Sequence, residues 1–367
     1  MVLRTLLSSV CVLATLNASL ACTAVDVVAG DGTVVAGRTM EWAVDMKWTL
    51  VSQPVGTSLT MSAPPSLGLP ARTITTKYAV VGVAPGVIPG NALLEGQNSA
   101  GLGMSANFLP GFTQYQTVTP QDRNYVSVLS FGTWSLGSYA TVAELKAALQ
   151  STKVWFDAAA LGTGDTPTTL HFVFTDKTGA SVVVEYVAGE LRLYDNATHV
   201  LTNAPTYDWQ LLNVRNYLNV STVGVQSVRI GTANVTALGQ GGGMVGIPGD
   251  YTPPSRFVRA TFLRHHATQP ATGADAVQAV GHILNTVDIP LGIAQSRDGN
   301  QLVSDYTQFV AIKDLTNNRL MITDYNHRLT YLTLDLNTIF AQDKPATIPI
   351  ADLPYPKGID ATSSLKK

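Results

Sequence analysis

The chain has 367 residues, of which 46% are hydrophobic and 13% are charged, and its formal net charge is −2. This hydrophobic fraction is enough for a large buried core and excludes intrinsic disorder, while the charged fraction is about half the usual ~25% of soluble proteins. Lysine and arginine do not cluster, and no Cys/His spacing fits zinc. These observations exclude a basic surface for nucleic acid or for an anionic membrane.

The first 21 residues have the pattern of a secretory signal peptide. Arg4 precedes an apolar stretch over residues 6–16, and Ser19-Leu20-Ala21 puts small residues at −3 and −1 of a cleavage site. The apolar stretch is too short for a bilayer, which takes about 20 residues, and no later segment is longer. We therefore predict cleavage after Ala21, no membrane insertion, and a periplasmic or secreted mature protein.

The predicted mature chain begins with its single cysteine. Cys11 lies in the signal peptide, so Cys22 alone remains and no internal disulfide can form. An N-terminal cysteine carries a thiol, whose pKa is about 8.5, beside an α-amine, whose pKa is about 7.7–8.0, so the amine can take the thiol proton near neutral pH. The sequence thus predicts an N-terminal nucleophile that needs no histidine and no cofactor.

The histidines show no metal-ligand spacing, and we interpret them as core or surface residues. They are His171, His199, His265, His266, His282 and His327.

A function of a different class stays open for the same cysteine. Cys22 is also the position at which a lipoprotein carries its lipid, so the chain could be a non-catalytic binding module anchored there. That processing prefers leucine at −3 and a small residue at −2, whereas the chain has Ser19 and Leu20. A free α-amine on Cys22 would distinguish the hydrolase from the lipoprotein, and intact mass would detect it.

Next along the chain, two β-branched runs flank Asp31-Gly32 and predict a β-hairpin. A two-residue turn at positions 31–32 places Glu41 opposite Cys22. A shift of one residue instead moves Arg38 onto the face of the cysteine. Either register returns a charged side chain to the thiol.

Later segments predict further strands and three helices. Capping boxes begin helices at Thr141 and Thr272, and a third helix follows Pro253-Pro254. Because strands and helices come in blocks, we expect an α+β fold with antiparallel sheets, with residues 22–353 as one catalytic domain and 354–367 as a polar tail. The predicted strands are 73–83, 169–175, 181–187, 190–194, 307–312, 319–323 and 328–334, and the third helix is 255–265.

Several segments in register resemble the choloylglycine hydrolase family, which includes bile salt hydrolases and penicillin V acylases. They are Cys22-Thr23, the run Gly-Arg-Thr-Met-Glu-Trp at 37–42, and residues 201–209 and 238–257. The resemblance implies a four-layer αββα sandwich of the N-terminal-nucleophile hydrolase type, amidase activity on a small-molecule amide, and assembly into a homotetramer.

The same resemblance implies roles for individual residues. Cys22 is similar to the family nucleophile, Arg38 to the arginine beside the thiol, and Arg256 to a second active-site arginine. Asn203 is similar to the side-chain donor of the oxyanion hole, and Asn107 matches the residue whose backbone N–H completes it. An arginine beside a thiol favours thiolate, and each oxyanion donor stabilises the intermediate by about 3–4 kcal/mol.

The carboxylate and the acyl site are less uniform in the family. Many members have aspartate where this chain has Glu41, whose extra methylene could still reach the amine. Trp42 and Phe108 are expected beside the acyl group. The Glu41-Trp42 pair is similar to exported acylases that act on penicillin V or acyl homoserine lactones, whereas Asn107 matches bile salt hydrolases. We therefore expect penicillin V-like or acyl homoserine lactone substrates, with conjugated bile salts as the alternative.

Overall fold

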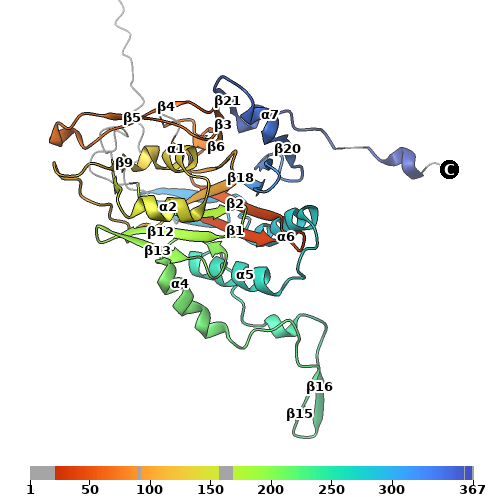
Figure 1. Cartoon of the computed structure of the whole chain (residues 1–367). Helices are drawn as coiled ribbons and strands as arrows, with labels where there is room; N and C mark the ends of the chain where they lie inside the picture. Colours follow the sequence, from red (N-terminus) through yellow and green to blue (C-terminus); the bar gives the residue numbers. More distant parts are fainter. Residues whose placement is uncertain (1–20, 89–91, 157–167, 359, 366–367) are drawn as a thin grey trace, which may run out of the picture.

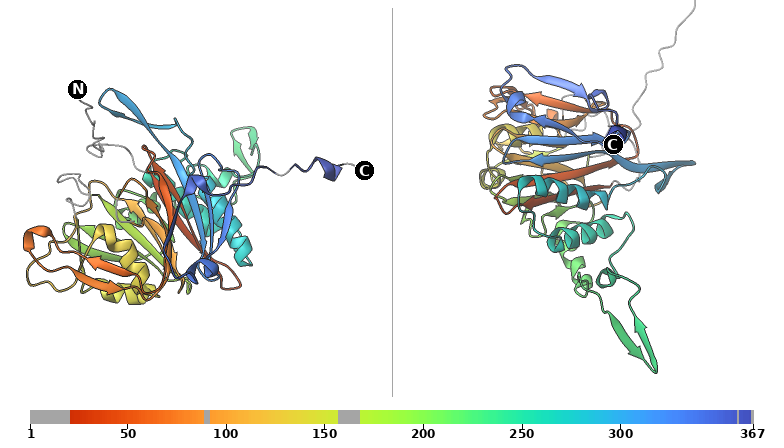
Figure 2. Two further views of the ribbon diagram at one scale, coloured as in Figure 1. Left: turned by 90° about the horizontal axis from the view of Figure 1, so that it is seen from above. Right: turned by 90° about the vertical axis from the view of Figure 1, so that its right-hand side faces the viewer.

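The computed structural model describes residues 21–88, 92–156, 168–358 and 360–365. The predicted signal peptide therefore lies outside the described residues, apart from Ala21. Two antiparallel sheets stack on each other at the centre of the molecule, with helices on both outer faces (Figures 1 and 2). Helices α1 and α2 cover one sheet, and α5 and α6 cover the other. The expected αββα sandwich is confirmed.

The seven-stranded sheet has the order β14-β1-β2-β18-β19-β20, and β17 pairs with β18. Its strands are β1 (Cys22–Val28), β2 (Val34–Trp42), β14 (Val200–Leu201), β17 (Ala294–Asp298), β18 (Gln301–Asp314), β19 (Arg319–Asp324) and β20 (Leu332–Asp335).

The eight-stranded sheet has the order β13-β12-β11-β8-β7-β6-β3-β21. Its strands are β3 (Trp48–Gln53), β6 (Val80–Pro85), β7 (Glu95–Asn98), β8 (Leu102–Phe108), β11 (Leu170–Asp176), β12 (Ser181–Val187), β13 (Glu190–Asp195) and β21 (Ala346–Pro349).

Three small two-stranded sheets and the helices complete the described chain. The pairs are β4 (Ser58–Met61) with β5 (Arg72–Thr75), β9 (Tyr125–Ser127) with β10 (Lys153–Trp155), and β15 (Ser227–Ile230) with β16 (Ala233–Thr236). The α-helices are α1 (Val128–Ser138), α2 (Val142–Leu149), α4 (Tyr207–Val214), α5 (Pro253–His266), α6 (Gly273–Asn285) and α7 (Leu336–Phe340). The 3₁₀ helices are η1 (Pro65–Leu67), η2 (Arg215–Tyr217), η3 (Gly242–Met244), η4 (Ile350–Asp352) and η5 (Thr362–Leu365).

The β1–β2 hairpin has the second of the two predicted registers. Cys22 lies opposite Met40, and Ala24 lies opposite Arg38. The loop has three residues between Ala29 and Thr33, which pair through a 2.8 Å hydrogen bond, and Gly32 has φ +85°. A three-residue loop that ends in a left-handed glycine shifts the pairing by one residue relative to a two-residue turn.

Several predicted strand boundaries differ in the structure, and the strand expected at 307–312 is the longer β18. The stretch 73–83 is two strands, because β5 pairs with β4 while β6 enters the eight-stranded sheet. Likewise β20 begins only at Leu332, because Thr330 N donates to His327 O and closes a turn before it. The predicted tail is packed at its start, since Tyr355 stacks on His327 with ring centroids 4.1 Å apart.

Residues 218–247, which we call the arm, carry β15, β16 and η3. The arm stands away from the two-sheet body (Figures 1 and 2). Its strands are exposed along their whole length. No described helix is both long and apolar enough to cross a membrane.

Candidate active site

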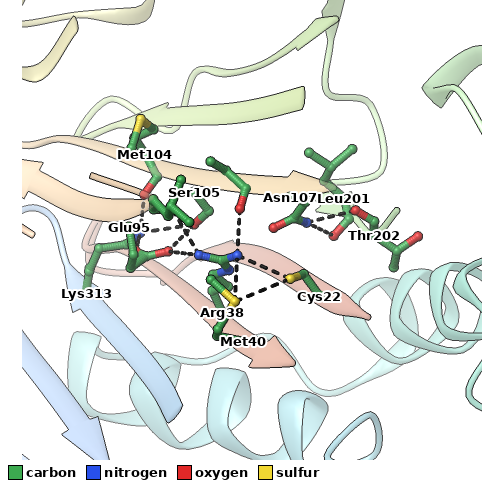
Figure 3. A network of polar contacts seen from close by, with 12 residues as sticks. Cys22, Arg38, Met40, Glu95, Met104, Ser105, Asn107, Leu201, Thr202 and Lys313 are labelled. Atoms are coloured by element: carbon green, nitrogen blue, oxygen red, sulfur yellow. Dashed lines mark hydrogen bonds and ion pairs between the residues drawn. The ribbon is translucent and has the colours of Figure 1, made fainter. Parts of the chain in front are cut away.

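Cys22 begins β1, between β14 and β2, and its side chain is fully buried. Arg38, Met40 and Trp42 alternate along β2 and share the face toward the eight-stranded sheet. With Cys22 directly opposite Met40, this alternation brings the Arg38 guanidinium to the thiol. Arg38 Nη2 lies 3.2 Å from Cys22 Sγ, and Met40 Sδ lies 3.7 Å from it (Figure 3).

The arginine beside the thiol is held by the opposite sheet. Arg38 Nη1 donates to Leu94 O at 2.8 Å, just before β7, and Nη2 donates to Ala106 O in β8 at 2.6 Å. Arg38 is fully buried, so its charge acts where water cannot screen it. The guanidinium therefore joins the two sheets at the nucleophile.

The backbone nitrogen of Cys22 is held by Asn203, which follows β14. Cys22 N donates to Asn203 Oδ1 at 2.6 Å, and Arg256 Nη2 donates to the same oxygen at 2.8 Å. Two donors on one atom fix the orientation of this amide, so its Nδ2 faces Phe108 O, at 3.0 Å. One of the two Nδ2 hydrogens makes that bond, and the other is the expected oxyanion donor, a role that stays a prediction.

Arg256 reaches the site from the first turn of α5. Its Nη1 donates to Cys22 O at 2.6 Å and to Thr23 Oγ1 at 2.7 Å, and Nε donates to Tyr251 O at 2.9 Å. Every bond of this buried guanidinium goes to backbone or to a site residue. Arg256 thus holds Cys22 and Asn203 in one arrangement.

Glu41 lies on the opposite face of β2, toward the helices, and is fully buried. Thr307 Oγ1 donates to Glu41 Oε1 at 2.6 Å, while Oε2 has no hydrogen-bond partner among the described residues. Burial raises the pKa of this carboxyl to about 7, although Arg256 nearby opposes the shift. In the described chain its backbone N donates to Ala21 O, and its carboxylate is bonded to Thr307 and not to the nitrogen of Cys22.

Arg38 and burial act in opposite directions on the Cys22 thiol. Burial raises the pKa of the Cys22 thiol, Arg38 opposes the shift, and Glu41 adds to it. Burial dominates because a sulfur anion without water has lost its solvation. Arg38 thus favours the thiolate without outweighing burial, and the role of the Cys22 nitrogen as base stays a prediction.

The other predicted residues surround this centre. Asn107 lies opposite His171 across β8 and β11, and its Nδ2 donates to Leu201 O at 3.2 Å and Thr202 O at 2.9 Å. Its side chain thus ties β8 to β14, and the oxyanion role of its backbone N–H stays a prediction.

Trp42 and Phe108 form an aromatic pair beside the site. Their ring centroids are 4.3 Å apart at 52°, and both side chains are buried. Trp42 Nε1 has no hydrogen-bond partner among the described residues. The pair brings together β2 and β8, the strands that carry Arg38 and Asn107.

Sequence reasoning missed four polar residues near the site, which are Glu95, Lys313, Asp305 and Thr307. A charged residue inside an apolar strand, as in Phe-Val-Ala-Ile-Lys at 309–313, was the available signal for one of them. Among the described residues no cluster of three or more His, Cys, Asp and Glu side chains is placed to hold a metal ion.

Comparison with known proteins identifies the family. Residues 22–348 match the sequence model of the linear amide C–N hydrolases, choloylglycine hydrolase family. The bile salt hydrolase/transferase of Clostridium perfringens is 33% identical over 66% of this chain and 73% of its own length. The penicillin V acylase of Pectobacterium atrosepticum is 28% identical over 62% of this chain and 55% of its own length.

A solved structure agrees with the sequence match. A single-residue variant of the conjugated bile acid hydrolase from Clostridium perfringens has a TM-score of 0.77 and 28% identity, covering 89% of this chain and 97% of that one. The protein belongs to the choloylglycine hydrolase family and is a hydrolase of linear amide C–N bonds.

Proposed function

We propose that the protein is an exported amidohydrolase whose nucleophile is Cys22 as the first residue of the mature chain. The observation that carries this proposal is the position of Cys22, with its sulfur on Arg38 and its nitrogen on Asn203. The match to the family begins at the same residue, which supports a mature chain that starts there.

The reaction forms an acyl-enzyme in two steps. The Cys22 nitrogen takes the thiol proton, and the sulfur attacks the amide carbon, which places negative charge on the carbonyl oxygen. Asn203 Nδ2 and the backbone of Asn107 stabilise that oxygen, and the amine nitrogen then returns the proton to the leaving amine. Water releases the acyl group by the reverse sequence.

Processing is the first test. N-terminal sequencing of the exported protein should begin Cys-Thr-Ala-Val, and its intact mass should show an unmodified α-amine. A lipid on Cys22, or a mature chain with another first residue, would refute the mechanism.

We propose an acyl group that is aromatic or of medium chain length, as in penicillin V or an acyl homoserine lactone. The supporting observation is the buried Trp42–Phe108 pair, whose aromatic rings and whose indole N–H, unpaired among the described residues, suit a short acyl chain with an ether or carbonyl oxygen. Conjugated bile salts are the second candidate, because the bile salt hydrolase/transferase of Clostridium perfringens shares more identity with this chain than the penicillin V acylase does.

Substrate choice is tested by kcat/KM for penicillin V, a C6–C10 acyl homoserine lactone and glycocholate in one buffer. We expect one of the first two to exceed glycocholate, and a tenfold preference for glycocholate would select the bile salt candidate. The control is Cys22→Ala, which should abolish hydrolysis of all three without loss of structure by circular dichroism. Turnover at the level of the parent chain by Cys22→Ala would show that the nucleophile is elsewhere.

A further inference from the structure

Lys313 and Glu95 form an ion pair in the interior of the molecule, behind the arginine of the site. Lys313 lies on β18 in one sheet and Glu95 on β7 in the other, and each residue is 1% exposed. Lys313 Nζ donates to Glu95 Oε1, to Met104 O at 3.0 Å and to Ser105 Oγ at 3.3 Å (Figure 3). All three hydrogens of the ammonium are therefore used inside the protein.

The carboxylate of this pair also lies beside Arg38 without a hydrogen bond to it. Arg38 Nη1 is 3.9 Å from Glu95 Oε2, whereas its hydrogen bond goes to Leu94 O at 2.8 Å. Glu95 Oε2 instead accepts from Ser105 Oγ at 2.6 Å. Lys313 and Ser105 thus occupy both oxygens of Glu95.

Apart from the ion pair with Glu95 at 3.9 Å, the groups that accept hydrogen bonds from Arg38 among the described residues carry no charge while the thiol is protonated. Apart from the sulfur of Cys22, they are the carbonyls of Leu94 and Ala106 and the sulfur of Met40. Of the groups that Arg38 touches by hydrogen bond, Cys22 is the one that can become an anion. The positive charge of Arg38 can therefore stabilise a thiolate on Cys22 Sγ.

Counting charges explains why a second buried cation matters. Arg38 and Lys313 carry two positive charges against the single carboxylate of Glu95, and a Cys22 thiolate makes the group neutral. Without Lys313, Glu95 would balance Arg38, and a thiolate would be an uncompensated anion in a buried site, which is strongly unfavourable.

We propose that Lys313 is a positioning residue for the nucleophile: by holding Glu95, it keeps the Arg38 guanidinium free for Cys22 Sγ. This inference rests on the proposed role of Cys22. Lys313 is faced by Glu95 and Arg38 and, more distantly, by Asp26 on β1, and burial lowers the pKa of its ammonium. The thiol is faced by Arg38 and Glu41, and its anion acts on Arg256.

The experiment measures thiol reactivity directly, without substrate. Cys22 is the single cysteine of a chain that begins at residue 22, so its alkylation by iodoacetamide can be followed by mass at each pH between 5 and 10. We expect Lys313→Met to raise the midpoint of alkylation by about one pH unit or more and to lower kcat about tenfold, with KM within about threefold.

The double variant Glu95→Gln/Lys313→Met is the decisive comparison. It removes both charges, keeps a hydrogen-bond partner for Ser105, and leaves Arg38 to the thiol, so the midpoint should return to that of the parent chain. A purely structural pair could also regain stability in the double variant, so the readout is the alkylation midpoint, which a loss of stability alone does not shift. Lys146→Met, in an exposed pair with Asp195, is the matched control and should change nothing.

Two results would overturn the proposal. One is an unchanged alkylation profile in Lys313→Met, and the other is a double variant that stays shifted. If Lys313→Met does not fold, Glu95→Gln is measured alone. This variant removes the anion beside Arg38, so it must not raise the pH midpoint of Cys22 alkylation. Because alkylation displaces iodide and cleaves no amide bond, a wrong substrate assignment would leave these outcomes intact. A wrong nucleophile is revealed separately by an active Cys22→Ala.

Discussion

At the scale of the residue, burial raises the pKa of the Cys22 thiol, so catalysis depends on groups that hold sulfur, nitrogen and oxyanion in fixed places. Asn203 contacts the nitrogen of Cys22 and is expected to contact the oxyanion. Its Oδ1 accepts from the nitrogen of Cys22 and from Arg256, and its Nδ2 is the expected oxyanion donor.

Asn203→Ala should lower kcat by roughly 10²–10³ and change KM little, because the lost donor acts mainly on the transition state. Steady-state kinetics of the mature protein measures both constants, and the exposed Asn216→Ala is the control. A raised KM with unchanged kcat would show that Asn203 only binds substrate.

Asp305 gives a test of pH dependence that does not involve the nucleophile. It is 4% exposed, its Oδ1 has no partner among the described residues, and burial raises the pKa of its carboxyl to about 7 against the opposing charge of Arg256. The ordinary value is 3.8, so between these pH values the folded chain binds more protons than the unfolded chain. The free energy of unfolding should therefore fall as the pH rises from about 4 to about 7.

Asp305→Asn should remove this dependence, on the order of 3 kcal/mol, and should be more stable than the parent chain at pH 8. Urea unfolding at pH 5, 6, 7 and 8 measures the difference, with the exposed Asp343→Asn as control. Parallel curves for Asp305→Asn and the parent chain would contradict the assignment.

Individual residues were predictable to different degrees. Cys22 followed from the position of one cysteine, while the hairpin narrowed its charged neighbour to Glu41 or Arg38 and the family resemblance favoured Arg38. Lys313 and Glu95 meet across two sheets and more than two hundred residues, and no local pattern records which strands face each other. The effect of Arg38 on the thiol pKa has the predicted direction, whereas the opposing effect of burial was not predictable, since the degree of burial is not visible in the sequence.

At the scale of the element, two glycines of the β1–β2 hairpin perform different tasks. A Cβ on Gly37 would lie 2.5 Å from Val280 and 2.9 Å from Leu284, both on α6. A Cβ on Gly32 would meet nothing within 4 Å, but its φ of +85° strains any other residue. The first glycine lets α6 pack on β2, and the second turns the chain.

Gly37→Ala should lower stability by about 1–3 kcal/mol through overpacking and should also lower kcat, because the neighbouring residue is Arg38. Gly32→Ala should lower stability by about 1 kcal/mol and leave kcat unchanged. Thermal unfolding and kinetics of the two variants separate these effects. Equal kcat values would show that β2 does not transmit the disturbance to the site.

Helix and strand boundaries were predictable where neighbouring residues in the sequence determine them. The capping box at Thr272 begins α6 as expected, with Thr272 and Asp275 bonded to each other's backbone. The hairpin register was not decidable, because a two-residue and a three-residue loop both fit Asp31-Gly32. The stretch 73–83 was likewise not decidable, because its composition suits one strand as well as two. It forms two strands because β5 pairs with β4 and β6 pairs with β3.

At the scale of the whole molecule, the arm stands apart because it does not pack on the two-sheet body (Figures 1 and 2). It exposes many large apolar side chains, which a monomer would leave in water. They are Leu218, Val223, Val225, Val228, Ile230, Val235, Leu238 and Val245. Because the homotetramer expected from the sequence would need such a surface, we propose that the arm packs against a second copy of the chain.

Val228→Asp combined with Ile230→Lys should reduce the mass measured by light scattering after gel filtration, and the parent chain should run as a tetramer. Leu329→Lys, at an exposed leucine outside the arm, is the control and should leave the mass unchanged. A monomeric parent chain would contradict the expectation.

The bond between Glu41 N and Ala21 O has a consequence for when the enzyme works. Ala21 is 2% exposed, so the last residue before the proposed cleavage site fills the space directly ahead of the nucleophile. While that residue stays, the nitrogen of Cys22 is an amide without basicity, and the buried Ala21 lies directly before it. In the proposed mechanism, cleavage after Ala21 supplies the base and removes this buried residue in one event, so we expect the uncleaved chain to be inactive and the processed chain to be active.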